Sequence, residues 1–68
     1  MTKREYERLE DAIFALIEQE KRYCADYVVQ NPDDRKRREF DRDLIITGMD
    51  LVQSKFREMK LSGEILIE

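Results

Sequence analysis

The stretch Gln30-Asn31-Pro32-Asp33-Asp34 contains the only proline of this 68-residue chain and lies near its middle. Pro32 has no backbone N–H and disfavours the α conformation at Asn31, so a helix arriving from the N-terminal side should end near Gln30. The same residues suit the start of a second helix, with Asn31 as N-cap, proline at the first helical position and carboxylates at the N-terminal end. The stretch therefore predicts a turn that joins two helices into an antiparallel hairpin.

Residues before the turn have the pattern of one long amphipathic helix. Thr2 and Glu5 form a capping-box pair, in which the Thr2 hydroxyl accepts from the Glu5 N–H and the Glu5 side chain reaches back to Thr2, so helix 1 should span about residues 3–30. Its apolar residues share one broad face, with Phe14 at the edge: Tyr6, Leu9, Ala12, Ile13, Leu16, Ile17, Tyr23, Cys24, Tyr27 and Val28. This face covers nearly half of the helix, which is too wide for one partner helix and favours a four-helix bundle.

The second half of the chain repeats the pattern after a turn at 31–33. Helix 2 should span about residues 33–61 and end at Ser62-Gly63, because glycine readily adopts the left-handed conformation that follows a helix. Its apolar face comprises Phe40, Leu44, Ile45, Met49, Leu51, Val52, Phe56 and Met59. Ile46 falls off this face, and we expect it to be exposed or to make a second contact. The sequence thus predicts an all-α hairpin over residues 1–63 that dimerises into a four-helix bundle.

Residues 64–68 form a short apolar tail, Glu64-Ile65-Leu66-Ile67-Glu68. A large aliphatic side chain left in water forgoes roughly 1.5–3 kcal/mol, so three in a row should pack somewhere. Three arrangements fit: a plug at the bundle end near Tyr6 and Leu9, a short strand paired with the same tail of another subunit, and a disordered or partner-binding tail.

Size and composition make self-association the expected route to stability. Chains this short usually rely on disulfides, a metal or oligomerisation. Cys24 is the only cysteine and histidine is absent, so an intrachain disulfide is excluded and a zinc site is disfavoured. Cys24 is expected to be a small core residue and not a reactive thiol. We therefore expect a dimer or a higher homo-oligomer that needs no cofactor.

The charge balance bears on partners and location. The net charge of −3 gives no general attraction to nucleic acid or to an anionic membrane. No apolar run approaches the roughly 20 residues of a spanning helix, and the charged N-terminus does not resemble a signal peptide. The expectation is a cytoplasmic protein without a membrane partner.

Three residues interrupt the apolar faces: Glu20, Gly48 and Lys55. A buried carboxylate needs a partner, and antiparallel pairing places Arg37 or Arg38 within reach of Glu20. The candidate polar cluster comprises Glu20, Tyr23, Tyr27, Arg37 and Asp41. It is either a functional polar site or, as we favour, a register-setting ion pair or a solvated end of the bundle.

Glycine costs about 1 kcal/mol inside a helix, so Gly48 indicates a close helix approach, either opposite Ile13 and Phe14 or at a two-fold axis. Lys55 is expected to extend toward Glu7 or Glu10.

One basic cluster, Arg35-Lys36-Arg37-Arg38, provides the candidate nucleic-acid contacts. Acidic residues interleave with it, and residues 33–43 together carry no net charge, so a solvated face with intrahelical ion pairs is favoured over a phosphate track. The acids Glu39, Asp43 and Asp50 point away from the apolar face and disfavour a carboxylate-held metal site. Without histidine, no His-dependent nucleophilic triad is possible, and we expect no enzymatic activity.

The first functional hypothesis is a small non-enzymatic regulator or inhibitor that acts by protein–protein interaction with a larger protein. Accessory proteins of phages and plasmids often have this size and architecture. Surplus apolar surface supports the hypothesis, and the candidate partner-binding residues are Phe14, Ile46, Ile65, Leu66 and Ile67.

In outline the chain also resembles the plasmid-encoded Rop family, with a hairpin of similar length, a turn near residue 30 and dimerisation into an antiparallel four-helix bundle. The resemblance implies binding of paired RNA loops through a face of helix 1 on which Lys3 and Phe14 would lie. Glu10 and Glu18 would share that face and repel phosphate. An RNA- or DNA-binding hairpin dimer is therefore the alternative, and a metal-dependent enzyme is a more remote one.

Overall fold

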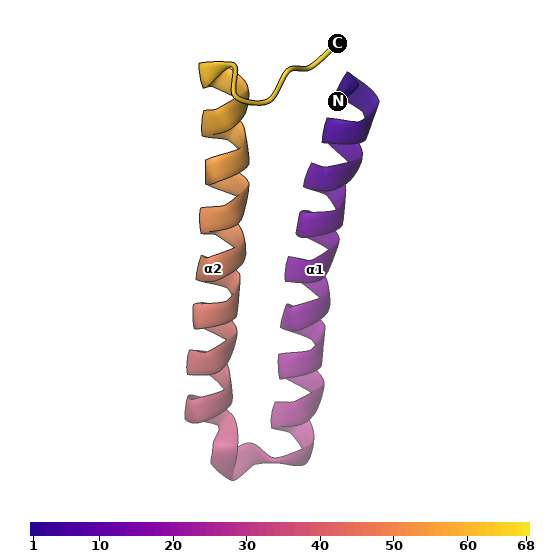
Figure 1. The fold of residues 1–68 in the computed structure, drawn as a ribbon. Helices are drawn as coiled ribbons and strands as arrows, with labels where there is room; N and C mark the ends of the chain where they lie inside the picture. The colour runs from indigo at the N-terminus through magenta and orange to yellow at the C-terminus, as the bar shows by residue number, and fades with distance from the viewer.

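The computed structural model describes all 68 residues and consists of two long helices joined by a tight turn. Helix α1 spans Lys3–Gln30, a 3-10 turn η1 spans Pro32–Asp34, and helix α2 spans Arg35–Ser62. The helices lie side by side and antiparallel, with both chain ends at the end opposite the turn (Figure 1). The prediction of an all-helical hairpin is confirmed.

The two ends of α1 are closed by different devices. At its start, the Glu5 N–H donates to the Thr2 hydroxyl over 3.2 Å. The Thr2 hydroxyl in turn donates to the Glu5 carboxylate over 3.2 Å, so the carboxylate bonds the side chain of Thr2 and not its backbone. At the end of α1, the backbone N–H and the side-chain amide of Asn31 both donate to the Tyr27 carbonyl, at 2.8 and 3.1 Å.

The expectation that Asn31 caps the second helix is therefore wrong. Its side chain makes no capping bond to the residues that follow, because it donates to the Tyr27 carbonyl in the last turn of α1. Pro32 opens the 3-10 turn instead, and regular α-helix begins only at Arg35.

The tail folds back across the open end of the hairpin. Gly63 has a φ of 81°, the left-handed conformation that ends α2. The Ile65 N–H then donates to the Met59 carbonyl at 3.2 Å, and Glu68 exchanges backbone hydrogen bonds with Met1 and Lys3 at 3.0 and 3.2 Å. Figure 1 shows this segment passing from the end of α2 to the start of α1.

The buried core is small and lies on one helix. Only four residues are buried, all on α1: Tyr6, Ile13, Ile17 and Cys24. No residue of α2 is buried. Twelve large hydrophobic side chains remain exposed.

The side of α2 that meets α1 differs from the expected one. Ile46 is half-buried, whereas Leu44 and Ile45 are exposed. Of the two expectations for Ile46, exposure is therefore wrong and a second contact stays a prediction. The polar residues Arg42 and Gln53 are likewise only partly exposed. Part of the expected apolar face of α2 is therefore turned away from α1 and exposed to solvent.

The hairpin is a single layer of helices. It measures 49 × 18 × 9 Å with a radius of gyration of 15.5 Å, against about 11 Å for a compact domain of this length. Its accessible surface is 5473 Å², whereas a compact monomer of this mass exposes about 4,600 Å². The chain thus exposes about 900 Å² more than a compact domain, and stable domains have at least two packed layers.

Candidate interaction face

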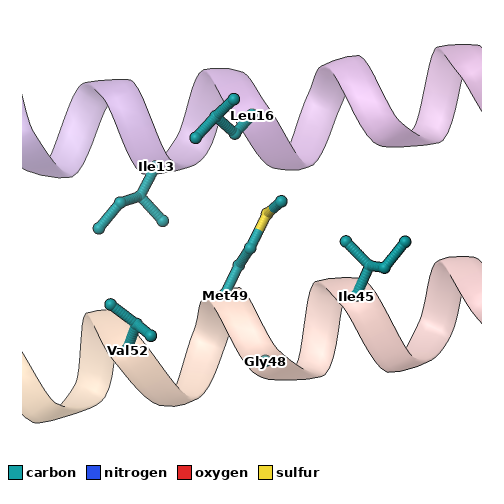
Figure 2. Close-up of a pocket in the computed structure, with 6 residues that line it drawn as sticks. All are labelled: Ile13, Leu16, Ile45, Gly48, Met49 and Val52. Atoms are coloured by element: carbon teal, nitrogen blue, oxygen red, sulfur yellow. The ribbon is translucent and has the colours of Figure 1, made fainter.

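An open apolar groove runs between the helices at mid-length (Figure 2). Its volume is about 460 Å³. Five of its six lining residues are hydrophobic and the sixth is Gly48. The hydrophobic ones are Ile13 and Leu16 from α1, and Ile45, Met49 and Val52 from α2. Leu16, Ile45 and Val52 are exposed although they line it. The groove is therefore a place where the hairpin presents apolar side chains to solvent.

Gly48 has no packing role within the hairpin. A Cβ atom placed on it would meet no atom within 4 Å, so the expected close approach opposite Ile13 and Phe14 is wrong. Glycine still weakens the helix by about 1 kcal/mol relative to alanine. The other expectation, a two-fold axis at Gly48, stays a prediction.

The groove belongs to a larger exposed surface, which we call the apolar face: Leu16, Leu44, Ile45, Gly48, Leu51 and Val52. The five large side chains are all 41% or more exposed. Isolated exposed leucines are ordinary, but a continuous apolar surface on a small protein marks an interaction site.

Lys55 lies on α2 beside the apolar face, and its only ion pair is a long one. Its ammonium is 3.8 Å from Glu58, and both side chains are exposed. The expected contact with Glu7 or Glu10 is wrong, because Glu10 faces Arg57 instead, at 3.5 Å. Lys55 is thus free to meet another acid.

The predicted polar cluster does not assemble as one site. Glu20 pairs with Arg38 at 2.6 Å, with side chains only 12% and 19% exposed, whereas Arg37 pairs with Asp34. Tyr23 is exposed and its hydroxyl accepts from the Gln19 amide at 2.6 Å. Asp41 is exposed and forms no ion pair.

The second part of the polar cluster holds the turn. The Tyr27 hydroxyl donates to the Asp34 carboxylate over 2.6 Å, and Arg37 donates to the same oxygen over 2.5 Å. The hydrogen bonds from Tyr27 and Arg37 lower the pKa of Asp34 below its ordinary 3.8. The bond to Asp34 and burial raise the pKa of Tyr27 above 10.0. Asp34 was missed as a site residue, although the spacing of Asp34 and Arg37, three apart near a helix start, is a signal for such a pair.

The basic cluster is largely neutralised by neighbouring carboxylates. Arg35 pairs with Glu39 at 2.9 Å, Arg37 with Asp34, and Arg38 with Glu20. Lys36 is the one member without an ion pair. Three of the four candidate nucleic-acid contacts are therefore already occupied within the chain.

The candidate partner-binding residues are spread over the molecule. Phe14 is 62% exposed, and its position two residues before Leu16 places it about 160° around α1, on the opposite side from the apolar face. Leu66 is exposed at the open end, while Ile65 and Ile67 are half-buried. Ile46 lies half-buried and does not belong with the exposed set.

The geometry gives little basis for a reactive thiol or a metal site. Cys24 is 1% exposed, which encloses its thiol. No group of three or more Cys, Asp and Glu side chains lies close enough together to hold a metal ion.

Neither helix has an apolar stretch that would let it cross a lipid bilayer.

No protein-family model, curated protein or solved structure matches the chain. The resemblance to the Rop family therefore gains no support from these comparisons, and the function follows only from the geometry of this chain.

Proposed function

We propose that this chain is a small non-enzymatic regulatory or inhibitor-type protein that acts by protein–protein interaction as a dimeric four-helix bundle. The supporting observation is the surplus of exposed apolar surface. Twelve large hydrophobic side chains are exposed while only four residues are buried. The excess of about 900 Å² compares with about 800 Å² per partner in a standard protein interface.

A second hairpin laid on the apolar face would supply the missing layer. Each copy would cover the groove of the other, giving the two packed layers of a stable domain. Dimerisation would leave two regions free: the side of α1 that points away from the apolar face, and the end of the hairpin where the tail lies.

Phe14 is then the residue best placed to meet a larger protein. It is an exposed aromatic on the side away from the apolar face, and aromatic side chains often carry much of the binding energy of an interface. Leu66 offers a second exposed contact at the open end.

The nucleic-acid alternative gains no support from the geometry. Arg35, Arg37 and Arg38 are paired with carboxylates, and the net charge is −3. Phosphate binding would have to break those pairs before releasing counterions.

Two measurements test the proposal. Sedimentation equilibrium should show a dimer at micromolar concentration. Affinity capture from an extract of the organism that encodes the chain should then retain a specific protein. Phe14→Ala should lose this protein and Val29→Ala should keep it, because Val29 is also an exposed apolar residue but lies elsewhere on α1. A folded monomer, or a captured protein indifferent to both changes, would refute the proposal.

A further inference from the structure

We propose that the apolar face is covered by α2 of a second copy of this chain, running antiparallel to the first, with Gly48 of both copies at the two-fold axis. The inference rests on the proposed dimer and specifies its interface. It follows from the arrangement of apolar residues, charges and free space around Gly48.

The apolar residues of α2 are symmetric about Gly48. Leu44 and Val52 lie four residues before and after it, and Ile45 and Leu51 lie three before and after it. All four are exposed. In an antiparallel pair centred on Gly48, residues equally distant from it on opposite sides face each other, so Leu44 meets the partner's Val52 and Ile45 meets the partner's Leu51. A two-fold interface requires the residues that it brings together to be compatible, and these four apolar residues meet that requirement.

The charges around Gly48 are complementary under the same rotation. Asp41 and Lys55 lie seven residues before and after it, which is close to two full turns and places both on the side of α2 that Gly48 occupies. A two-fold axis at Gly48 brings Asp41 against the partner's Lys55, and it does so twice. Asp41 forms no ion pair within the chain, and Lys55 has only its 3.8 Å contact with Glu58, so both are available.

Gly48 itself provides the space for the crossing. Nothing lies within 4 Å of a Cβ atom built there, and a residue without a side chain lets two helix backbones approach closely. Gly48 is also thirteen residues from Arg35 and fourteen from Ser62, the two ends of α2. An axis at this point therefore overlaps the two α2 helices along their whole length and places the two turns at opposite ends of the bundle.

A different dimer would place the two turns at the same end. In that arrangement α2 faces α1 of the partner, and Asp41 no longer meets the partner's Lys55. The charge pair therefore distinguishes the two architectures.

The test is a charge reversal with rescue, read as the dimer dissociation constant by sedimentation equilibrium at low salt. Asp41→Lys and Lys55→Asp each turn two attractions into two repulsions, and each should weaken the dimer about tenfold. The double variant Asp41→Lys/Lys55→Asp restores opposite charges across the axis and should return to near the original constant. Asp50→Lys is the matched control, since this exposed acid lies about 160° around the helix from Gly48.

A second variant tests the close approach. Gly48→Leu removes a helix-weakening glycine where the hairpin has open space, so a single hairpin gains helix stability. The same side chain would hold the two helices apart, and the dimer should dissociate more readily.

Each outcome decides the matter. Weakening by both single reversals with rescue by the double variant supports the inference. A dimer whose constant is unchanged by the reversals and by Gly48→Leu overturns this interface and leaves the proposed dimer standing. A folded monomer overturns both.

Discussion

Arg38 of α2 lies 2.6 Å from Glu20 of α1, and the two side chains are only 19% and 12% exposed. This is the least exposed ion pair that joins the two helices. Charges removed from water need each other, so shifting one helix along the other by one turn would leave two unpaired charges in the seam. The pair therefore fixes the register in which the apolar residues of the hairpin meet.

Removing the carboxylate of Glu20 should destabilise the fold more than removing an exposed one. Glu20→Ala leaves Arg38 unpaired in the seam, whereas Glu18→Ala removes only the exposed contact with Lys21. The loss of unfolding free energy should be roughly three times larger for Glu20→Ala, since broken buried pairs cost far more than surface pairs. Urea denaturation followed by circular dichroism, at one fixed protein concentration, measures both.

The double variant Glu20→Leu/Arg38→Met serves as the control for this prediction. An apolar pair of similar volume often matches or exceeds the stability of a buried ion pair. Equal losses for Glu20→Ala and Glu18→Ala would show that the pair contributes nothing to the register.

The turn and the helices could be predicted from local rules, because Pro32 and the helical spacing of apolar residues act within a few residues. The contact between the helices could not. Apolar residues cover nearly half of each helix, so the pattern does not say which part faces the neighbour, and it left open whether Ile46 would be exposed or make a second contact.

The polar cluster could be predicted only in part, because the rotation of each helix about its own axis is not fixed by the pattern. Glu20 was found because a carboxylate on an apolar face needs a partner, but choosing between Arg37 and Arg38 depends on a rotation of about 100°. Asn31 was assigned to the wrong helix because its amide can cap either one, and in the structure it donates to the Tyr27 carbonyl of α1.

Protonation of Asp34 should lower the stability of the fold at acidic pH. Its pKa in the folded chain is below the ordinary 3.8, because Tyr27 and then Arg37 donate hydrogen bonds to its carboxylate. Because the pKa of Asp34 is lower in the folded chain than in the unfolded chain, its ionised carboxylate stabilises the fold fully at pH values above the unfolded pKa. This stabilisation is lost as the pH falls through the folded pKa. The original chain should therefore have a larger free energy of unfolding than Asp34→Asn at pH 7, and this difference should shrink below about pH 4. Thermal unfolding across this range would contradict the prediction if the difference were independent of pH.

The tail should stabilise the hairpin through alternate side chains. Ile65 and Ile67 are half-buried, whereas Leu66 between them is exposed. Ile67→Ala should lower the unfolding free energy by about 1 kcal/mol, and Leu66→Ala should change it by less than about 0.5 kcal/mol. Chemical denaturation of the two variants gives the comparison, and equal effects would mean that the tail does not pack as the structure has it. If Leu66→Ala instead abolishes capture of a larger protein while leaving stability intact, Leu66 belongs to the partner-binding surface.

Substitutions at two adjacent residues of α1 should distinguish the stability of the single hairpin from the stability of the dimer. Ile17 is buried within one chain and Leu16 is half-exposed on the apolar face. Ile17→Ala should cost about 2–4 kcal/mol by leaving a cavity in the core. If two hairpins pair through the apolar face, the thermal midpoint of the original chain should rise with protein concentration, because association stabilises only the folded state. Leu16→Ala should flatten that rise, whereas Ile17→Ala should lower the midpoint at every concentration and preserve the slope. A midpoint that does not depend on concentration in the original chain would mean that the apolar face stays uncovered and that the hairpin is stable alone.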